Sequence, residues 1–375
     1  MAPMRPVRFL PPLALLLLLA QCSHPPAAVT VEGARELGPL PFAKAIRGRD
    51  GGYSARLGGR SVFVFGDTTL EVEADDGYRW RTSTRAWTAD ADASDGLTGF
   101  EEPMDSKSAP PEFLPLTPAE KLFNDTHFGP KAQPGCIPDC GARFALWPGA
   151  VVALPEGGAL VFYTKLTARP GDFNFSGLGN SLASWKKPEE PPVRPEVRPG
   201  ESEPTLLFPR GEPALGTAAL LEGDELFAFA CDCSGLSCPC SLARAKVKDA
   251  LTRSAWRFLE DGRWTSDAGD ADALFDGGAM MSVHRSALTG GFLALYSKPA
   301  SAEVVLRTAP SLEGPWSEEL HLFDAMPPDD PKAFPYAALA HPELVRDGGH
   351  KEYVTYFRGT GFLQGELRLV ELTLR

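Results

Sequence analysis

The stretch that decides the fold is RDGGYSARLGGRSVFVFGDT, residues 49–68. It holds two half-apolar runs, Tyr53–Leu57 and Ser61–Phe65, joined at Gly58-Gly59. A Gly-Gly pair supplies the positive φ angles that a two-residue hairpin turn requires. The stretch therefore predicts a β-hairpin in which Leu57 lies opposite Arg60.

Two acidic residues of this hairpin are expected to face each other. With a two-residue turn, Asp50 lies directly opposite Asp67 on one face of the sheet. Facing carboxylates repel, which separates their pKa values, and acid–base catalysis needs one protonated and one ionised group. The structural alternative is that Asp67 caps a turn while Asp50 pairs with Arg49 or Arg47. A turn one residue longer would also place the two acids on opposite faces.

The hairpin pattern recurs along the chain. An apolar run, a Gly-containing turn and a second, aromatic-rich run occur at Gly52–Phe65, Pro148–Tyr163, Thr217–Phe229, Met280–Tyr296 and His341–Phe357. Third and fourth strand-like runs follow, and helical periodicity is scarce. This repetition predicts an all-β fold, a five-bladed β-propeller of four-stranded antiparallel blades over residues 35–375. A two-sheet sandwich is the alternative.

Two segments between the repeats have signals of their own. Thr117 followed by Pro118 and by Glu120 predicts a short helix near Pro118–Asn124. The Pro- and Glu-rich segment Lys186–Pro204 is expected to be an exposed, poorly ordered loop. The acids Asp90, Asp92 and Asp95 lack the spacing of a calcium-binding loop, so we expect no metal there.

Composition and net charge indicate which kinds of binding partner to expect. The 375 residues include 37 Gly and 36 Pro, which is typical of a turn-rich protein, and the formal net charge is −12. That charge argues against nucleic-acid and anionic-membrane partners, and it suits neutral substrates such as sugars. The chain has no Gly-x-Ser-x-Gly, HExxH or phosphate-loop motif. We expect a monomer without a cofactor.

The N-terminus has the pattern of an export signal. Arg5 and Arg8 precede the apolar run Leu13–Ala20, which is too short to span a bilayer. The sequence Leu-Ala-Gln-Cys ending at Cys22 resembles a lipoprotein cleavage box, although Gln21 replaces the usual small residue. We therefore expect a signal peptide at 1–21, a lipidated Cys22 and a tether at 22–34. Plain secretion after a cut near Ala27 is the alternative.

Six further cysteines are expected to form disulfides in an oxidising compartment. In CDCSGLSCPC, a turn at Ser234–Ser237 places Cys233 opposite Cys238 and Cys231 opposite Cys240. Cys136 and Cys140 would close a small separate loop. A four-thiolate zinc site is the alternative for the cluster.

Candidate substrate contacts lie beside the aspartates or at corresponding places in the later repeats. Trp147 and Tyr53 can stack on a sugar ring or pack in the core. His341 is either a pocket donor or a structural group, and His284 is expected to be structural. The full set of expected contacts is Arg49, Tyr53, Trp147, Thr217 and His341.

Several motifs together resemble a bacterial family, formerly of unknown function, that contains endo-D-arabinanases. They are RGRDGGYS, VFVFGDT, ASDGL, EFLPLTPAEKLFN, ALWPGAVV, VVLRTAPSLEGPWS and the closing AHPEL…YVTYF…LRLVEL. The resemblance covers about residues 35–375 and implies a five-bladed propeller. It also implies that Asp50 and Asp67 cleave a furanoside bond. The expectation is an exported glycoside hydrolase acting on a D-arabinan-like polysaccharide. The alternative is a non-catalytic propeller that binds glycans or proteins at the cell surface.

Overall fold

The computed structural model describes residues 29–375 except 134, 136–138, 172–173, 270 and 331–332. The expected signal peptide, Cys22 and most of the expected tether lie outside the described residues. Strand β1 begins at Val31, four residues before the expected start of the propeller. Among the described residues, no helix is both long enough and apolar enough to cross a membrane.

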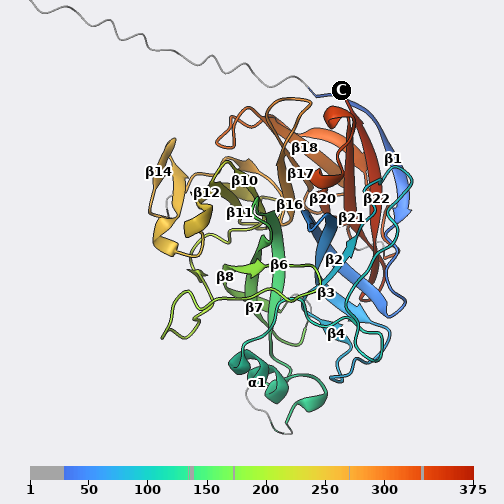
Figure 1. Ribbon diagram of the computed structural model, residues 1–375, viewed down its shortest axis with the longest axis vertical. Coiled ribbons are helices and arrows are strands. Elements are labelled where there is room, and N and C mark those ends of the chain that lie inside the picture. The colour runs from blue at the N-terminus through green and yellow to red at the C-terminus, as the bar shows by residue number, and fades with distance from the viewer. Residues whose placement is uncertain (1–28, 134, 136–138, 172–173, 270, 331–332) are drawn as a thin grey trace, which may run out of the picture.

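Five antiparallel sheets make up the molecule, which confirms the five-bladed propeller (Figure 1). The first sheet contains β2 (Ile46–Leu57), β3 (Arg60–Leu70), β4 (Trp80–Arg81) and β5 (Thr84–Thr88). The second contains β6 (Arg143–Ala153), β7 (Ala159–Ala168), β8 (Phe175–Trp185) and β9 (Phe208–Pro209). The third has six strands: β10 (Ala218–Glu222), β11 (Glu225–Cys231), β12 (Pro239–Lys246), β13 (Arg257–Glu260), β14 (Arg263–Thr265) and β15 (Phe275–Asp276).

The last two sheets have four strands each. The fourth contains β16 (Met281–Arg285), β17 (Phe292–Ser297), β18 (Glu303–Ala309) and β19 (Leu320–Asp324). The fifth contains β20 (Tyr336–Ala340), β21 (Lys351–Gly361), β22 (Gln364–Leu374) and β1 (Val31–Pro39). Helices are short: α1 (Pro118–His127) and the 3-10 turns Gly129–Lys131, Val247–Asp249, Arg253–Ala255, Pro342–Leu344 and Asp347–Gly349.

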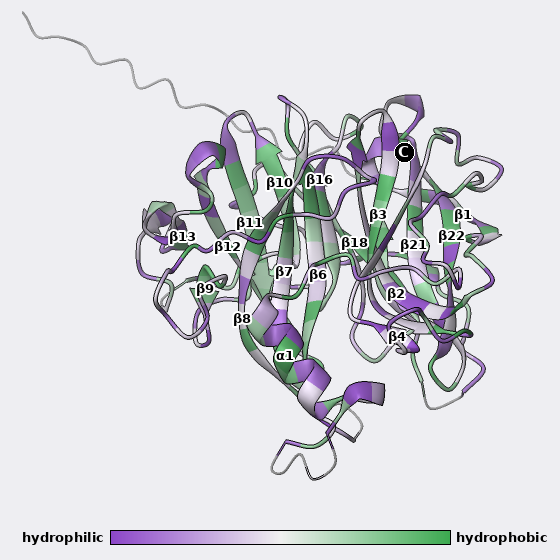
Figure 2. Cartoon of the chain, turned by 60° about the horizontal axis from the view of Figure 1, so that its bottom comes forward, coloured by the Kyte–Doolittle hydropathy of each residue, from purple (hydrophilic) through white to green (hydrophobic). Residues whose placement is uncertain are grey.

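The first strand of each sheet lies innermost. Strands β2, β6, β10, β16 and β20 contact one another in that order, and β20 contacts β2 again (Figure 1). Apolar clusters fill the spaces between neighbouring sheets, including one that joins the fifth sheet to the first. Figure 2 shows apolar stretches along the strands and polar residues in many of the loops. Side-chain packing between sheets therefore holds the ring together.

The ring is closed by the two ends of the described chain. Strand β1, near the N-terminus, pairs with the C-terminal strand β22 from Val31↔Leu374 to Pro39↔Arg368. The N-terminal segment thus supplies the outermost strand of the last sheet.

The fifth repeat differs from its expected position. The sequence pattern placed a first strand at His341, but the innermost strand is β20, and the 3-10 turns Pro342–Leu344 and Asp347–Gly349 lie between it and β21. Pro342 follows His341 directly and has no N–H to donate to a sheet, so the strand ends before it. This displacement matters because β20 begins at Tyr336.

The helix forms where predicted, and the Pro- and Glu-rich segment is the expected irregular and largely exposed loop, although its Arg194 side chain is buried. Glu120 N donates to Thr117 Oγ1 over 3.2 Å, and Thr117 N donates to Glu120 Oε2 over 2.8 Å, which makes a capping box. Arg194, from within Lys186–Pro204, donates to both oxygens of Glu120 over 2.7 and 2.9 Å. The segment is fastened to α1 through a side chain that is only 2% exposed.

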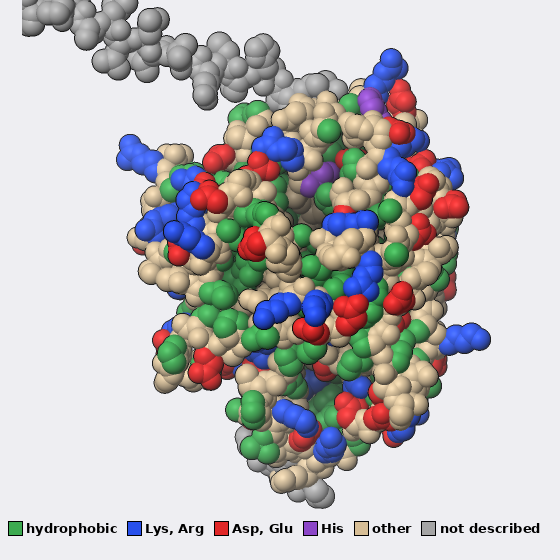
Figure 3. Space-filling view, viewed as in Figure 1, with side chains coloured by type: hydrophobic (Ala, Val, Ile, Leu, Met, Phe, Trp, Pro, Cys, Tyr) green, Lys and Arg blue, Asp and Glu red, His purple; other side chains and the backbone are tan. Residues whose placement is uncertain are grey.

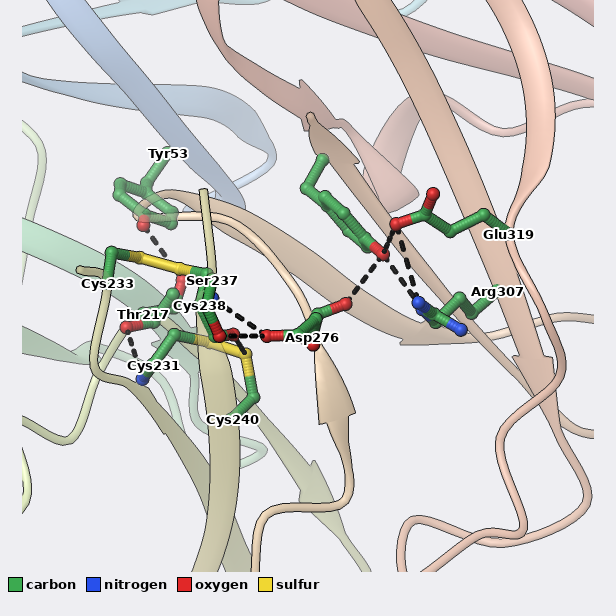
Figure 4. The surroundings of a disulfide bond; sticks show 11 residues. Tyr53, Thr217, Cys231, Cys233, Ser237, Cys238, Cys240, Asp276, Arg307 and Glu319 are labelled. Atoms are coloured by element: carbon green, nitrogen blue, oxygen red, sulfur yellow. Dashed lines mark hydrogen bonds and ion pairs between the residues drawn. A yellow bond between two sulfur atoms is a disulfide. The ribbon is translucent and has the colours of Figure 1, made fainter. Parts of the chain in front are cut away.

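The cysteine cluster forms the expected ladder rather than a zinc site. Cys231 bonds to Cys240 and Cys233 to Cys238, with Cα atoms 4.0 and 3.9 Å apart (Figure 4). The two disulfides link the end of β11 to the start of β12, across the connection between these strands. The expected bond between Cys136 and Cys140 is not tested, because Cys136 lies outside the described residues.

Candidate functional site

The first hairpin has the predicted register over most of its length. Leu57 pairs with Arg60, Ser54 with Phe63, and Arg49 with Thr68. The pairing register of β2 with β3 shifts between Arg49 and Gly51 and again between Gly51 and Tyr53, and Gly51 pairs with Phe65. Asp50 consequently lies opposite the two residues Gly66 and Asp67, in a bulge, instead of directly opposite Asp67.

Glycines make this bulge sterically possible. Gly51 and Gly52 have φ angles of 84° and 104°, which L side chains rarely adopt. A Cβ atom at Gly66 would lie 2.6 Å from Asp50 Oδ1. The Asp50 carboxylate therefore lies directly against the backbone of β3.

Asp50 accepts hydrogen bonds from one side chain and from backbone N–H groups. The Tyr336 hydroxyl donates to Asp50 Oδ2 over 2.9 Å, and the backbone N–H of Asp67 donates to the same carboxylate. Burial raises the pKa of Asp50 to about 6, while these hydrogen bonds act in the opposite direction.

Asp67 has a higher pKa than its neighbour. Trp147 Nε1 donates to Asp67 Oδ1 over 3.1 Å. Burial, and then the charge of Asp50, raise the pKa of Asp67 to about 8, against the effects of the Trp147 hydrogen bond and the Arg143 charge. Both aspartates remain partly exposed. Near neutral pH the pair therefore holds one ionised and one protonated carboxyl, each in reach of solvent.

Aromatic side chains and one arginine lie on the Asp67 side of the pair. The ring of Trp147 contacts that of Phe175 edge-on, with centroids 5.0 Å apart, and Phe175 is 46% exposed. The Arg143 guanidinium lies 4.0 Å from the ring centroid of Trp80 and 4.6 Å from that of Phe128. Its Nε has no hydrogen-bond partner among the described residues.

Two of the expected substrate contacts are enclosed by protein. The side chain of Arg49 is fully buried, pairs with Glu102 over 2.8 Å and lies 3.8 Å from the ring centroid of Phe65. His341 is also fully buried; its ring nitrogens bond to Ser54 and Thr355 over 2.6 and 2.9 Å. Burial lowers the pKa of His341 to about 3, so the ring is neutral. These contacts give Arg49 and His341 structural roles.

Tyr53 and Thr217 link the first and third sheets. The Tyr53 hydroxyl donates to the carbonyl oxygen of Thr217 over 2.8 Å, and Thr217 Oγ1 accepts from the backbone N–H of Cys231 (Figure 4). Tyr53 is 7% exposed. The disulfide ladder therefore lies beside the innermost strands, where it steadies Thr217 and, through it, Tyr53.

Sequence reasoning missed Tyr336 and Arg143. Tyr336 is the first residue of β20, the innermost strand of the fifth sheet. The sequence pattern placed this strand at His341, so Tyr336 was not considered. Arg143 begins β6, four residues before Trp147. Correct strand starts would have pointed to both residues.

Two surface pockets lie away from the aspartates. One, of about 480 Å³, is lined by Gly211, Glu212, Arg253, Ser266, Asp267, Ala268 and Gly269. The other, of about 520 Å³, is lined by Pro41, Phe42, Ala43, Trp87, Phe100, Glu101, Glu102 and Met104. Within the part of the chain that the structure describes, no three His, Cys, Asp or Glu residues are grouped to hold a metal ion.

Comparison with known proteins identifies the family. The family model described as Domain of unknown function (DUF4185) matches residues 166–357, just over half of the chain, so the chain belongs to this family. No curated protein matches the chain.

Solved structures share the fold at low sequence identity. A protein from Bacteroides ovatus is 13% identical, with 88% of this chain and 86% of that chain covered and a TM-score of 0.57. A family 117 glycoside hydrolase from the marine bacterium Zobellia galactanivorans is 12% identical, with coverage of 91% and 90% and a TM-score of 0.53. These likenesses agree with the propeller described above.

Proposed function

We propose that this member of the DUF4185 family is an exported glycoside hydrolase that cleaves a furanosidic, D-arabinan-like polysaccharide with Asp50 and Asp67. The observation that carries the proposal is the pair of neighbouring, partly exposed carboxyls whose pKa values are about 6 and about 8. Glycoside hydrolysis needs such a pair, one to donate a proton and one to act as an anion.

The chemistry follows from the two protonation states. The protonated carboxyl gives its proton to the glycosidic oxygen as the bond from that oxygen to the anomeric carbon breaks. The ionised carboxylate either attacks the anomeric carbon or takes a proton from an attacking water. The first hairpin places Asp50 opposite Gly66 and Asp67, and direct attack with retention of configuration would require the two carboxyls to lie about 5 Å apart.

The substrate class rests on several supporting features. Trp147 and Phe175 present aromatic rings beside Asp67, and sugar rings stack on such surfaces. One solved propeller of similar fold is a glycoside hydrolase by its printed name. The furanosidic, D-arabinan-like substrate comes from the resemblance to a family that contains endo-D-arabinanases. No cofactor is proposed.

The N-terminal signal and the disulfides support export. Disulfides persist in oxidising compartments outside the cytoplasm, and the Cys231–Cys240 and Cys233–Cys238 bonds fit such a location. We propose attachment to the cell envelope through a lipid on Cys22, with secretion as the alternative. Mass spectrometry of the mature N-terminus decides between them: a diacylated Cys22 supports the anchor, and an unmodified end near Ala27 contradicts it.

A non-catalytic propeller that binds glycans is the second candidate. It is favoured by one observation, that two surface pockets of about 480 and 520 Å³ lie away from the aspartates and offer other places for a ligand. The two candidates differ in whether bonds are broken.

A panel of purified polysaccharides separates them. The panel contains D-arabinan, L-arabinan and pyranosidic xylan and glucan, and each is incubated with the full mature chain. Release of reducing ends from D-arabinan alone is expected. Binding without release across the panel would support the second candidate, and release from a pyranosidic polymer alone would contradict the proposed substrate class.

A further inference from the structure

We propose that Tyr336 is a positioning residue that fixes Asp50 as the ionised carboxylate and thereby leaves Asp67 as the proton donor. This assignment rests on the proposed function and goes beyond it, because it gives the two aspartates different roles. It also adds a residue of the fifth sheet to a site whose two aspartates belong to the first sheet.

The backbone around Tyr336 is shaped to present its side chain. Tyr336 begins β20, and the pairing of β20 with β21 shifts between Tyr336 and Leu339. Ala337, the next residue, has a φ angle of 57°, in the left-handed region that residues with a Cβ rarely occupy. Such a strained position persists only where the surrounding structure enforces it. Here its effect is to interrupt the ladder beside the tyrosine.

The side chain of Tyr336 spans two sheets. Its ring packs against Phe357 with centroids 4.9 Å apart, and its hydroxyl reaches Asp50 Oδ2 over 2.9 Å. Tyr336 is 41% exposed. Burial of the ring therefore does not explain the position, whereas the hydrogen bond to Asp50 does.

The donors and charges around the pair are distributed unequally. Asp50 accepts from the Tyr336 hydroxyl and from the backbone N–H of Asp67, and hydrogen bonds to a carboxylate stabilise its ionised form. Among the described residues, Asp67 accepts one side-chain hydrogen bond, from Trp147 at Oδ1. The negative charges of Asp50 and Glu112 oppose ionisation of Asp67, and the positive charge of Arg143 favours it. The balance leaves the negative charge on Asp50.

The proposed roles balance in protons and electrons. Trp147 occupies Oδ1 of Asp67, so the proton resides on Oδ2 and passes to the glycosidic oxygen while the glycosidic bond breaks. Asp50 supplies the electron pair, either to the anomeric carbon or to a proton of the attacking water. At the end of this step Asp67 is ionised, and Asp50 is an ester or a neutral acid.

The variant Tyr336→Phe tests the assignment, because it keeps the ring against Phe357 and removes only the O–H. Loss of a donor to the carboxylate raises the pKa of Asp50. The acidic limb of the pH profile of kcat/KM should therefore move up by about one pH unit while the basic limb stays in place. An equal loss of activity at every pH, or an unmoved acidic limb, would overturn the assignment.

A second measurement is independent of activity. Titration of the ¹³Cγ resonances of the aspartates by NMR, with Asp50→Asn used for assignment, should show the pKa of Asp50 rising in Tyr336→Phe. The matched control is Tyr353→Phe, which removes a hydroxyl that donates to Glu371 over 3.1 Å on β22. An unchanged Asp50 titration contradicts the role of Tyr336. If no glycan is cleaved but the Asp50 titration shifts, the proposed function fails and the positioning role stands.

Discussion

Gly66 determines where the carboxylate of Asp50 can lie. A Cβ atom at this position would approach Asp50 Oδ1 to 2.6 Å, and it would meet no backbone atom of another residue within 4 Å. The φ angle of Gly66 lies outside the positive region, so an alanine can adopt its backbone conformation. A substitution of Gly66 by alanine should therefore displace the Asp50 carboxylate and no other group.

We predict that Gly66→Ala lowers kcat/KM about 100-fold, because a displacement of about 1 Å at a reacting group has this effect. The free energy of unfolding should change by less than about 1 kcal/mol, since the backbone is compatible. Gly33→Ala is the control, because a Cβ there meets nothing within 4 Å. Steady-state kinetics and thermal denaturation check both variants. Activity of Gly66→Ala equal to that of Gly33→Ala would contradict the placement of Asp50.

The pH dependence of activity follows from the two carboxyls. Activity requires Asp50 ionised, with a pKa of about 6, and Asp67 protonated, with a pKa of about 8. We therefore predict a bell-shaped profile of kcat/KM that rises through about pH 6 and falls through about pH 8. Assays from pH 4.5 to 9.5 at constant ionic strength test it. A rate that still increases above pH 9 would be incompatible with proton donation by Asp67.

At the residue scale, local features were predictable and distant partners were not. The Gly58-Gly59 turn fixed the register closely enough to bring Asp50 and Asp67 together, although two bulges alter their pairing. Tyr336 is 286 positions away from Asp50, and only closure of the ring brings them into contact. Arg49 is adjacent to Asp50 in sequence, but strand alternation turns its side chain to the opposite face, toward Phe65 and Glu102.

At the scale of elements, helix α1 depends on a buried ionic network. Glu120 pairs with Arg194 and with Lys165 over 2.7 and 2.8 Å, and these side chains are at most 5% exposed. Burial alone would raise the pKa of Glu120, but Arg194 and Lys165 outweigh it and lower the pKa to about 2. The pairing thus contributes stability above the unfolded pKa of about 4.5, and this stability is lost as the pH falls toward 2.

We predict that Arg194→Met destabilises the protein by about 3 kcal/mol at pH 7, because it leaves Glu120 buried with only part of its compensation. The difference from the unaltered protein should shrink at pH 3, as Glu120 in the variant takes up a proton. Arg198→Met, which removes an exposed pair with Glu201, should cost less than about 0.5 kcal/mol. Urea denaturation at both pH values measures these effects. Equal destabilisation by the two variants would contradict the network.

The elements themselves were predictable where their signals are local. The capping box of Thr117 and Glu120, the Gly-containing hairpins and the paired cysteines all involve residues close in sequence. The segment Lys186–Pro204 has a composition typical of disordered loops, yet Arg194 has its partner 74 positions away. Composition alone cannot reveal such a contact.

At the scale of the whole molecule, the ring depends on pairing of its two ends. Strand β1 is largely exposed, so backbone hydrogen bonds to β22 account for most of its attachment. Thr30 and Arg375 continue the ladder, with N–H···O distances of 2.8 and 2.9 Å. Without β1, the edge of β22 would be free to pair with another chain.

We predict that removal of residues 29–39 lowers the free energy of unfolding by roughly 4 kcal/mol, given the modest net value of each backbone hydrogen bond. The shortened chain should also associate through the free edge of β22. Thermal denaturation and size-exclusion chromatography check the two effects. A shortened chain that remains monomeric with unchanged stability would show that the ring closes without β1.

The number of blades was predictable from repetition, but the manner of closure was not. Each repeat has its own turn glycines, whereas β1 has no partner nearby in sequence and joins a strand more than 300 positions away. On the face shown in Figure 3, basic and acidic side chains are interspersed.

The account depends most on the claim that Asp50 and Asp67 together break a glycosidic bond. The most direct measurement is the rate of reducing-end release from purified D-arabinan by the unaltered chain, Asp50→Asn and Asp67→Asn. We predict that each substitution lowers kcat at least about 1,000-fold, as loss of an acid, base or nucleophile does, with binding of the polysaccharide and thermal stability retained. Release by either variant at the rate of the unaltered chain would contradict the account.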